Sequence, residues 1–126
     1  MRHDAYSPRV PWQILFHQEV VGWIHQLNPK EKLSVDLAVE ALREKGPVLG
    51  RPLVDVVKDS GFKNMKELRP LGTTLRCLFA FDQLRRAIVL VAGDKHGMWR
   101  NWYQENVPLA DSRFKEHLTS MHRDLS

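Results

Sequence analysis

Three runs of strand-forming residues joined by short turns occupy the middle of the chain, and they constrain its fold more than any other feature. Their composition predicts strands at Met65–Arg69, Leu75–Phe81 and Arg86–Ala92, with turns at Pro70–Gly72 and Asp82–Gln83. The last run contains AIVLVA, which is apolar on both faces, so this strand is expected to be central or covered on both sides. In the first two runs apolar and polar residues alternate, which predicts that each strand has one exposed or functional face.

A strand and two helices are predicted before this meander. The strand spans Trp12–His17, and apolar residues then recur at helical spacing from Val20 to Leu27. The tetrapeptide Asn28–Glu31 supplies an N-cap asparagine, a proline at the first helical position and a glutamate at the third, which mark the start of a second helix. Gly46–Pro47 ends that helix, so the two helices are expected to form an antiparallel hairpin.

A packed connection and a final helix complete the predicted order. Residues 47–64 are rich in glycine and proline but keep apolar residues, which indicates a connection with no domain boundary. The last helix carries one apolar stripe made of Phe114, Leu118, Met121 and Leu125. The order β-α-α-β-β-β-α predicts an α+β fold with helices packed on a small, mostly antiparallel sheet. We expect residues 1–126 to form one domain, with its core at about 12–124.

The charge of the chain is mildly basic and unevenly placed. The 126 residues carry a net charge of +4 with a pI of about 9.5, a balance that favours polyanionic partners. Much of the excess is local, because Lys63, Lys66, Arg69 and Arg76 lie within one short stretch that contains only Glu67 as an acid.

Several classes of protein are disfavoured by what the sequence lacks. Cys77 is the only cysteine, which excludes an internal disulfide and favours a reducing compartment. No apolar run has the length of a signal peptide or a membrane span, so a soluble, cytoplasmic protein without a membrane partner is expected. No HExxH spacing, Ser-His-Asp order or G-x-S-x-G elbow occurs, so neither a metal nor a cofactor is expected.

Two arginines in the first two strands of the meander form a candidate phosphate site. Side chains alternate across a strand, so Glu67 and Arg69 share one face, and Arg76 can approach Arg69 across the hairpin. Both arginines would point away from the face that buries Leu68 and Leu75. Guanidinium groups donate two hydrogen bonds to phosphate and stay charged. From the residues alone, a solvated ion-pair network of the two arginines with Glu67 is the preferred alternative.

Two further segments contain candidate residues. GDKHG follows the third strand, where loops often carry reactive groups, and it presents Lys95 and His96. It is not a P-loop, and a turn with a surface histidine is the preferred alternative. MWRNWY combines Arg100 with aromatic rings that could stack on bases. Helical spacing favours core packing for Trp99 and Trp102, whereas the hydroxyl of Tyr103 could reach a site.

The order of these elements resembles the RelE/ParE-like toxins of bacterial toxin–antitoxin pairs, specifically the HigB-like or phage-derived branch. The resemblance covers roughly residues 12–124 and rests most on E-L-R followed by L-R-x-L-F-x-F. It implies a RelE-like fold and an mRNA endonuclease that acts in the ribosomal A site without a metal. In that chemistry the 2′-hydroxyl attacks the adjacent phosphate, which requires a base, an acid and charge stabilisation.

The resemblance also implies roles for the candidate residues. Arg69 and Arg76 would hold the scissile phosphate, and Glu67 would orient an arginine or act as a base. Lys95 and His96 match the stretch used for acid–base work, although the lysine-rich F-x-K-K segment of many HigB-like chains is missing here. RNA contacts are assigned to the remaining basic or aromatic candidates, which are Lys63, Lys66, Arg100 and Tyr103.

Partners and alternatives follow from the same resemblance. The implied partner is an antitoxin of the helix-turn-helix type, with operator DNA contacted only through the antitoxin complex. The main alternative is a ParE-like protein that inhibits DNA gyrase by protein contact, because one fold supports both outcomes. The third alternative is a degenerate toxin that is retained only as a binding partner or as a component of a DNA complex.

Overall fold

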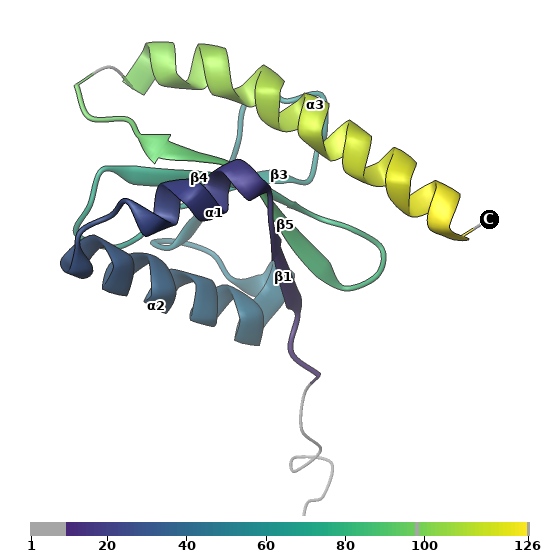
Figure 1. Cartoon of the computed structure of the whole chain (residues 1–126), viewed down its shortest axis with the longest axis horizontal. Helices are drawn as coiled ribbons and strands as arrows, with labels where there is room; N and C mark the ends of the chain where they lie inside the picture. The colour runs from purple at the N-terminus through teal and green to yellow at the C-terminus, as the bar shows by residue number, and fades with distance from the viewer. Residues whose placement is uncertain (1–9, 98, 126) are drawn as a thin grey trace, which may run out of the picture.

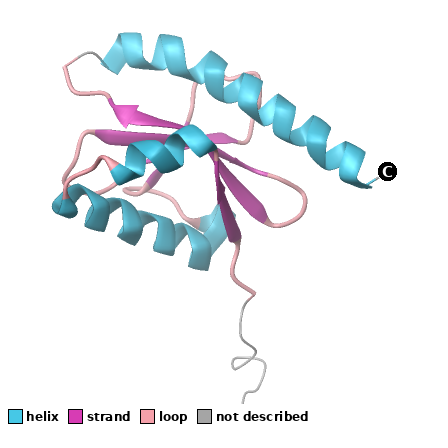
Figure 2. Ribbon diagram, viewed as in Figure 1, coloured by secondary structure: helices cyan, strands magenta, loops and turns pink. Residues whose placement is uncertain are grey.

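The computed structural model describes residues 10–97 and 99–125 and places a mixed sheet between two layers of helices (Figure 1). Figure 2 shows the strands running through the middle of the molecule. In chain order the elements are β1 (Gln13–Phe16), α1 (Gln18–His25), α2 (Pro29–Lys45), the short 3-10 helix η2 (Gly46–Val48), β2 (Val54–Val56), β3 (Met65–Leu68), β4 (Leu75–Phe81), β5 (Arg86–Asp94) and α3 (Trp99–Leu125).

The five strands lie in the order β1-β5-β4-β3-β2. β1 runs parallel to β5, and the other neighbouring strands are antiparallel. The predicted meander therefore forms the centre of the sheet, with β5 between β1 and β4. The α+β fold and the mostly antiparallel sheet predicted from the sequence are confirmed.

Local sequence signals explain where α2 begins and ends. The side chain of Asn28 accepts a hydrogen bond from the Glu31 N–H at 2.8 Å, and Glu31 Oε1 accepts one from the Asn28 N–H at 3.0 Å. This capping box satisfies two donors that a helix start leaves unpaired. Gly46 ends the helix with φ +57°, and a Cβ there would lie 2.2 Å from Nε1 of Trp12. Only glycine fits both requirements.

Two apolar cores lie on opposite faces of the sheet. Alternate residues of β4, such as Cys77 and Phe79, face α1 and α2, whereas Leu78 and Ala80 face α3. Within β4, the register of its pairing with β5 shifts between Leu78 and Phe79. The apolar AIVLVA run supplies both cores, as its composition predicted.

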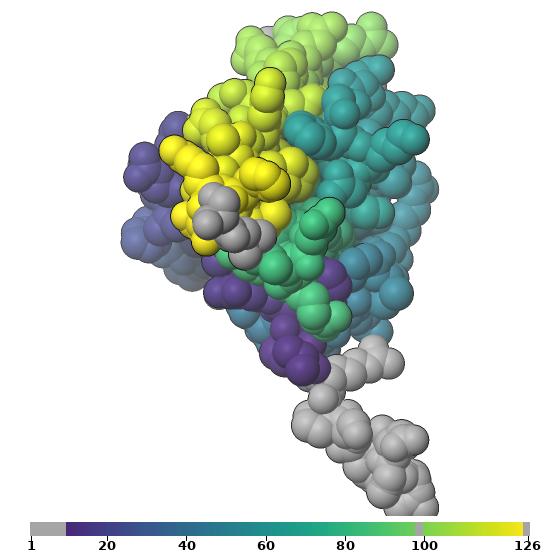
Figure 3. Space-filling model, turned by 90° about the vertical axis from the view of Figure 1, so that its right-hand side faces the viewer, coloured from purple at the N-terminus to yellow at the C-terminus, as the bar shows by residue number. Residues whose placement is uncertain are grey.

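The structure corrects the prediction that one face of the first two strands of the meander is open. α3 covers that face, and Met65, Leu78 and Ala80 are fully buried beneath it. Figure 3 shows the C-terminal half of α3 (yellow) between the N-terminal helices and the teal central segment. Arg113 of α3 pairs with Glu19 of α1 at 2.5 Å, so the helix is tied to its neighbours as well as to the sheet.

Two elements differ from the sequence prediction. β2 lies in the segment that was expected to be a connection, and it pairs with β3 along the edge of the sheet. α3 begins at Trp99 and continues through Pro108, whereas the last helix was expected only after this proline. Val107 and Ala110 are buried on either side of Pro108, so packing on the sheet stabilises the helix despite the missing N–H. No helix in residues 10–97 and 99–125 is long and apolar enough to cross a membrane.

Candidate functional site

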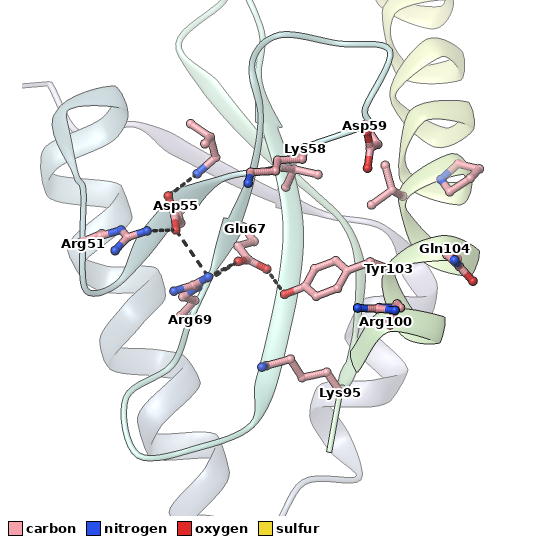
Figure 4. A pocket seen from close by; sticks show the side chains of 14 residues that line it. Arg51, Asp55, Lys58, Asp59, Glu67, Arg69, Lys95, Arg100, Tyr103 and Gln104 are labelled. Atoms are coloured by element: carbon pink, nitrogen blue, oxygen red, sulfur yellow. Dashed lines mark hydrogen bonds and ion pairs between the residues drawn. The ribbon is translucent and has the colours of Figure 1, made fainter. Parts of the chain in front are cut away.

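A cleft of about 720 Å³ lies between the β2–β3 edge of the sheet and the N-terminal half of α3 (Figure 4). Its charged lining residues include more cations than acids. The cations are Arg51, Lys58, Arg69, Lys95 and Arg100, and the acids are Asp55, Asp59 and Glu67. The cleft is therefore basic, with its acidic groups interspersed among the cations.

Glu67 lies at the centre of the hydrogen-bonded network in the cleft. It is only 4% exposed, and its Oε2 atom accepts from Nη2 of Arg69 at 2.7 Å and from Nε at 2.9 Å. The hydroxyl of Tyr103 donates to Oε1 of the same carboxylate. β3 directs Glu67 toward α3 because Met65, two residues earlier, packs in the core beneath that helix. The buried carboxylate is thus satisfied by one cation and one hydroxyl.

These contacts fix the protonation of both partners of Glu67. Burial raises the pKa of Tyr103 to about 12, and the hydrogen bond to Glu67 adds to the rise. Burial alone would lower the pKa of Arg69, but the hydrogen bond and the charge of Glu67 raise it. At neutral pH Tyr103 therefore carries its proton and Arg69 its charge.

Asp55 of β2 extends the network toward the mouth of the cleft. Its Oδ2 atom lies 2.8 Å from Nη2 of Arg51 and 3.5 Å from Nη2 of Arg69, and its Oδ1 accepts from the Val56 N–H at 2.9 Å. The Val56 N–H and the Arg51 side chain lower the pKa of Asp55. Figure 4 shows these side chains in a line from the segment before β2 to Tyr103 on α3.

Arg76 lies beside the network, and it is not among the residues that line the cleft. Its Nη1 donates to the Leu75 carbonyl at 2.7 Å, and its buried Nε has no hydrogen-bond partner among the described residues. Burial and Glu67 raise the pKa of Tyr103, and Arg76 opposes that rise through its charge and a hydrogen bond. Arg76 therefore contacts the network through Tyr103. The pairing of Leu68 with Cys77 also puts Arg69 and Arg76 at adjoining positions of the β3–β4 hairpin, as expected from the sequence.

The two candidate residues of the GDKHG segment lie in different environments in the structure. Lys95 lines the cleft, and its N–H donates to the Thr74 carbonyl at 3.1 Å. His96 is exposed and does not line the cleft. Its backbone N–H donates to Asp94 at 2.9 Å, and Asp94 also accepts from Thr74 at 2.5 Å. These hydrogen bonds, the one from Thr74 above all, lower the pKa of Asp94.

The predicted RNA-binding residues also fall into two groups. Arg100 and Tyr103 line the cleft. Lys66 pairs with Phe79 and alternates with Glu67, so it belongs to the opposite face of the sheet. Lys63 is exposed in the loop before β3 and lies outside the cleft lining. The structure thus does not bring these two lysines to the cleft.

The aromatic segment packs as its helical spacing predicted. Trp102 is partly buried against the core beneath α3, and a Cβ at Gly93 would lie 2.7 Å from its Nε1 atom. The ring of Tyr103 meets that of Trp102 edge-on, with centroids 5.2 Å apart. The side chain of Trp99 lies outside the described part of the structure. Packing of Trp102 on Gly93 thus positions the neighbouring Tyr103.

Arg51 and Asp55 belong to the ion-pair network of the cleft, and sequence reasoning missed both. The short alternation in LVDVV was the available signal for Asp55, since Val54 is buried and Asp55 faces the other side of a strand. That signal spans three strand residues and lies in a glycine- and proline-rich segment. For Arg51 no sequence signal exists, because its role depends on the position of Asp55.

Comparison with known proteins places the chain in a family. Residues 22–115 match the family model described as "Phage derived protein Gp49-like (DUF891)". The Mycobacterium tuberculosis protein named "Putative toxin HigB3" is 50% identical over 109 residues, which cover 86% of this chain and 96% of that protein. "Putative toxin HigB2" of the same organism is 47% identical over 104 residues, or 80% of this chain and 52% of that protein. The chain thus matches about half the length of HigB2.

A solved structure shares the fold. A chain of the toxin–antitoxin complex RelBE2 from Mycobacterium tuberculosis matches with a TM-score of 0.51 and 18% identity, over 69% of this chain and 94% of that one. This likeness supports the RelE-like fold expected from the sequence. With the family match and the identity to HigB3, it confirms the resemblance drawn from the sequence, and the chain belongs to the phage-derived Gp49-like family together with HigB-like relatives.

Proposed function

We propose that this protein is the toxin of a type II toxin–antitoxin pair and cleaves mRNA on the ribosome without a metal ion. The observation that carries the proposal is the network of Arg69 and Tyr103 around the buried carboxylate of Glu67 in a basic cleft, with Arg76 next to it. The toxin names of its relatives and the toxin–antitoxin complex that shares its fold support the toxin part of this proposal.

The proposed reaction is attack of an RNA 2′-hydroxyl on the adjacent phosphate. Arg69 and Arg76 stabilise the negative charge that develops on the phosphorane, since a guanidinium stays charged and donates to phosphate oxygens. Arg76 is suited to this role because its charge acts on Tyr103, which lines the cleft.

Glu67 and Tyr103 form the proposed proton acceptor. The 2′-hydroxyl hydrogen-bonds to the Tyr103 oxygen, whose own proton already points to Glu67. As the P–O bond forms, the hydroxyl proton passes to Tyr103 while the Tyr103 proton passes to Glu67. Lys95 lines the same cleft, and its ammonium group donates a proton to the departing 5′-oxygen. His96, the other sequence candidate for acid–base work, lies outside the cleft lining.

The proposed partners are a helix-turn-helix antitoxin, which neutralises the toxin, and mRNA in the ribosomal A site. Operator DNA is contacted only through the antitoxin complex. The proposal is tested by inducing the protein alone and mapping mRNA 5′ ends with and without translation. Growth arrest with translation-dependent cuts supports it. A DNA-damage response with intact mRNA indicates the gyrase-inhibitor alternative, and harmless induction of the folded protein indicates a degenerate toxin.

A further inference from the structure

One carboxylate oxygen contacts two arginines that line the same cleft. Oδ2 of Asp55 lies 2.8 Å from Nη2 of Arg51 and 3.5 Å from Nη2 of Arg69. The three side chains differ in exposure, with Arg51 76% exposed, Arg69 35% and Asp55 19%. Arg51 thus stands at the solvent side of the network, while Arg69 reaches inward to Glu67.

The pairing of β2 with β3 explains why two arginines lie next to Asp55. Asp55 is the direct cross-strand partner of Glu67, and two like charges at such positions destabilise a sheet. Arg69 lies between the two carboxylates and contacts both. Arg51 pairs with the same Oδ2 atom of Asp55. The backbone N–H of Val56 holds Oδ1 of Asp55, so the other oxygen is fixed toward the arginines.

The guanidinium groups of Arg51 and Arg69 both have N–H donors that are available to a ligand. Glu67 and Asp55 use Nε and Nη2 of Arg69, and Asp55 uses Nη2 of Arg51. Among the described residues, no hydrogen bond or ion pair involves Nη1 of Arg69, or Nη1 and Nε of Arg51. Two planar groups with unused N–H donors, held by one oxygen at the edge of a cleft, suit a ligand that carries repeated anionic groups.

We infer that Arg51 is a further phosphate-binding residue, besides Arg69 and Arg76, and that Asp55 is the positioning residue that holds Arg51 and Arg69 for neighbouring phosphates of one RNA strand. The inference rests on the proposed function in that RNA is the ligand. In this arrangement Arg69 binds the phosphate at the cleavage point, and Arg51 binds a flanking phosphate that lies nearer to solvent. A carboxylate in this position lowers the net charge of the cleft but fixes the orientation of both cations.

The Arg51 part of the inference is tested by the salt dependence of binding. The probe is a single-stranded 2′-O-methyl oligonucleotide, which cannot be cleaved by 2′-hydroxyl attack. Each phosphate contact on a single strand contributes about 0.7 to the slope of log affinity against log salt concentration. Arg51→Gln is expected to reduce that slope by about 0.7 relative to the natural protein. An unchanged slope, or no binding of the probe by the natural protein, overturns the inference.

The Asp55 part is tested by comparing binding with cleavage. Asp55→Asn removes a negative charge but loosens both arginines, so probe affinity is expected to hold or rise while cleavage slows by about 10- to 100-fold. Asp59→Asn is the matched control, because Asp59 lines the same cleft without contacting either arginine. Asparagine tolerates the φ of +67° at that position. Equal losses of binding and cleavage in Asp55→Asn, or equal slowing by Asp59→Asn, contradict the positioning role.

The two proposals fail in different ways. If the natural protein cleaves no RNA but Arg51→Gln still lowers the salt slope, the proposed function is wrong and the phosphate site stands. If cleavage occurs and the slope is unchanged, Arg51 is not a phosphate-binding residue. Weaker antitoxin binding by Arg51→Gln with an unchanged RNA slope assigns the residue to a protein interface and overturns the inference.

Discussion

The hydroxyl of Tyr103 on α3 donates a hydrogen bond to Oε1 of Glu67 on β3, two residues that lie 36 positions apart in the chain. The contact joins the helix to the only strongly buried glutamate among the described residues. It also fixes the protonation of Tyr103, since burial and this hydrogen bond raise the pKa of that residue to about 12. The same contact therefore stabilises the fold and belongs to the proposed reaction.

Tyr103→Phe should separate packing from hydrogen bonding. The ring keeps its edge-on contact with Trp102, but Oε1 of Glu67 loses a donor while it stays buried. We expect a loss of about 1–3 kcal/mol in the free energy of unfolding, measured by urea denaturation. Cleavage should slow by about 100-fold or more because the proton path is interrupted. Undiminished cleavage by this variant would remove Tyr103 from the reaction.

Arg69→Gln should leave the carboxylate of Glu67 buried without its cation. We expect the free energy of unfolding to fall by about 1.5–3 kcal/mol. Combining Arg69→Gln with Glu67→Gln removes the buried charge and should recover most of that loss. Both variants should lack toxicity. A double variant that regains stability and also arrests growth would show that the pair is only structural.

Arg76→Gln should abolish growth arrest on induction at an equal level of soluble protein, since the variant lacks the charge that stabilises the phosphorane. Arg43→Gln is the matched control. Arg43 pairs with Glu40 on the exposed surface of α2 at 3.4 Å, and such surface pairs contribute about 0–1 kcal/mol. The control should arrest growth like the natural protein. Full toxicity of Arg76→Gln would exclude it from the mechanism.

Asp82 should contribute stability that disappears in acid. Its Oδ2 lies 2.7 Å from Arg86 Nε and 2.9 Å from His117 Nε2. Burial alone would raise the pKa of Asp82, but hydrogen bonds from His117, Arg86 and the Leu84 N–H lower it below the ordinary 3.8. The stabilisation is therefore complete above about pH 4 and is lost as the pH falls through the folded-state pKa.

Asp82→Asn tests this dependence. At neutral pH the variant should be less stable by about 1.5–3 kcal/mol, measured by urea denaturation. The difference in the free energy of unfolding between the variant and the natural protein should become smaller as the pH falls below 4. If this difference in the free energy of unfolding stayed constant down to pH 2, the charge of Asp82 would contribute nothing to stability.

Much of the fold follows from local signals. The capping box at Asn28 and Glu31, the glycine at the end of α2 and the alternation along β4 each act within a few residues, so the sequence predicts the helical hairpin and the meander. The direction of Glu67 and Arg69 toward one face follows from the same alternation. These features depend on contacts and backbone geometry within a few residues of the chain.

The remaining features depend on contacts between distant segments. β2 has three residues, too few for a reliable alternation, and its pairing with β3 places Asp55 opposite Glu67. The continuation of α3 through Pro108 depends on packing against the sheet, which overrides the local preference. This longer helix covers the face that alternation suggested was open, and it brings Tyr103 to Glu67. Neither Arg51 nor Asp55 could be assigned before those pairings were known.

The chemical nature of the RNA ends tests the central claim most directly. Translation-dependent cleavage by the purified protein can be followed by mass spectrometry of the fragments, with Arg69→Gln as the inactive comparison. Attack by the 2′-hydroxyl predicts a 2′,3′-cyclic phosphate on one fragment and a 5′-hydroxyl on the other. Fragments that carry a 5′-phosphate and a 3′-hydroxyl, or no cleavage by the natural protein, would contradict the account.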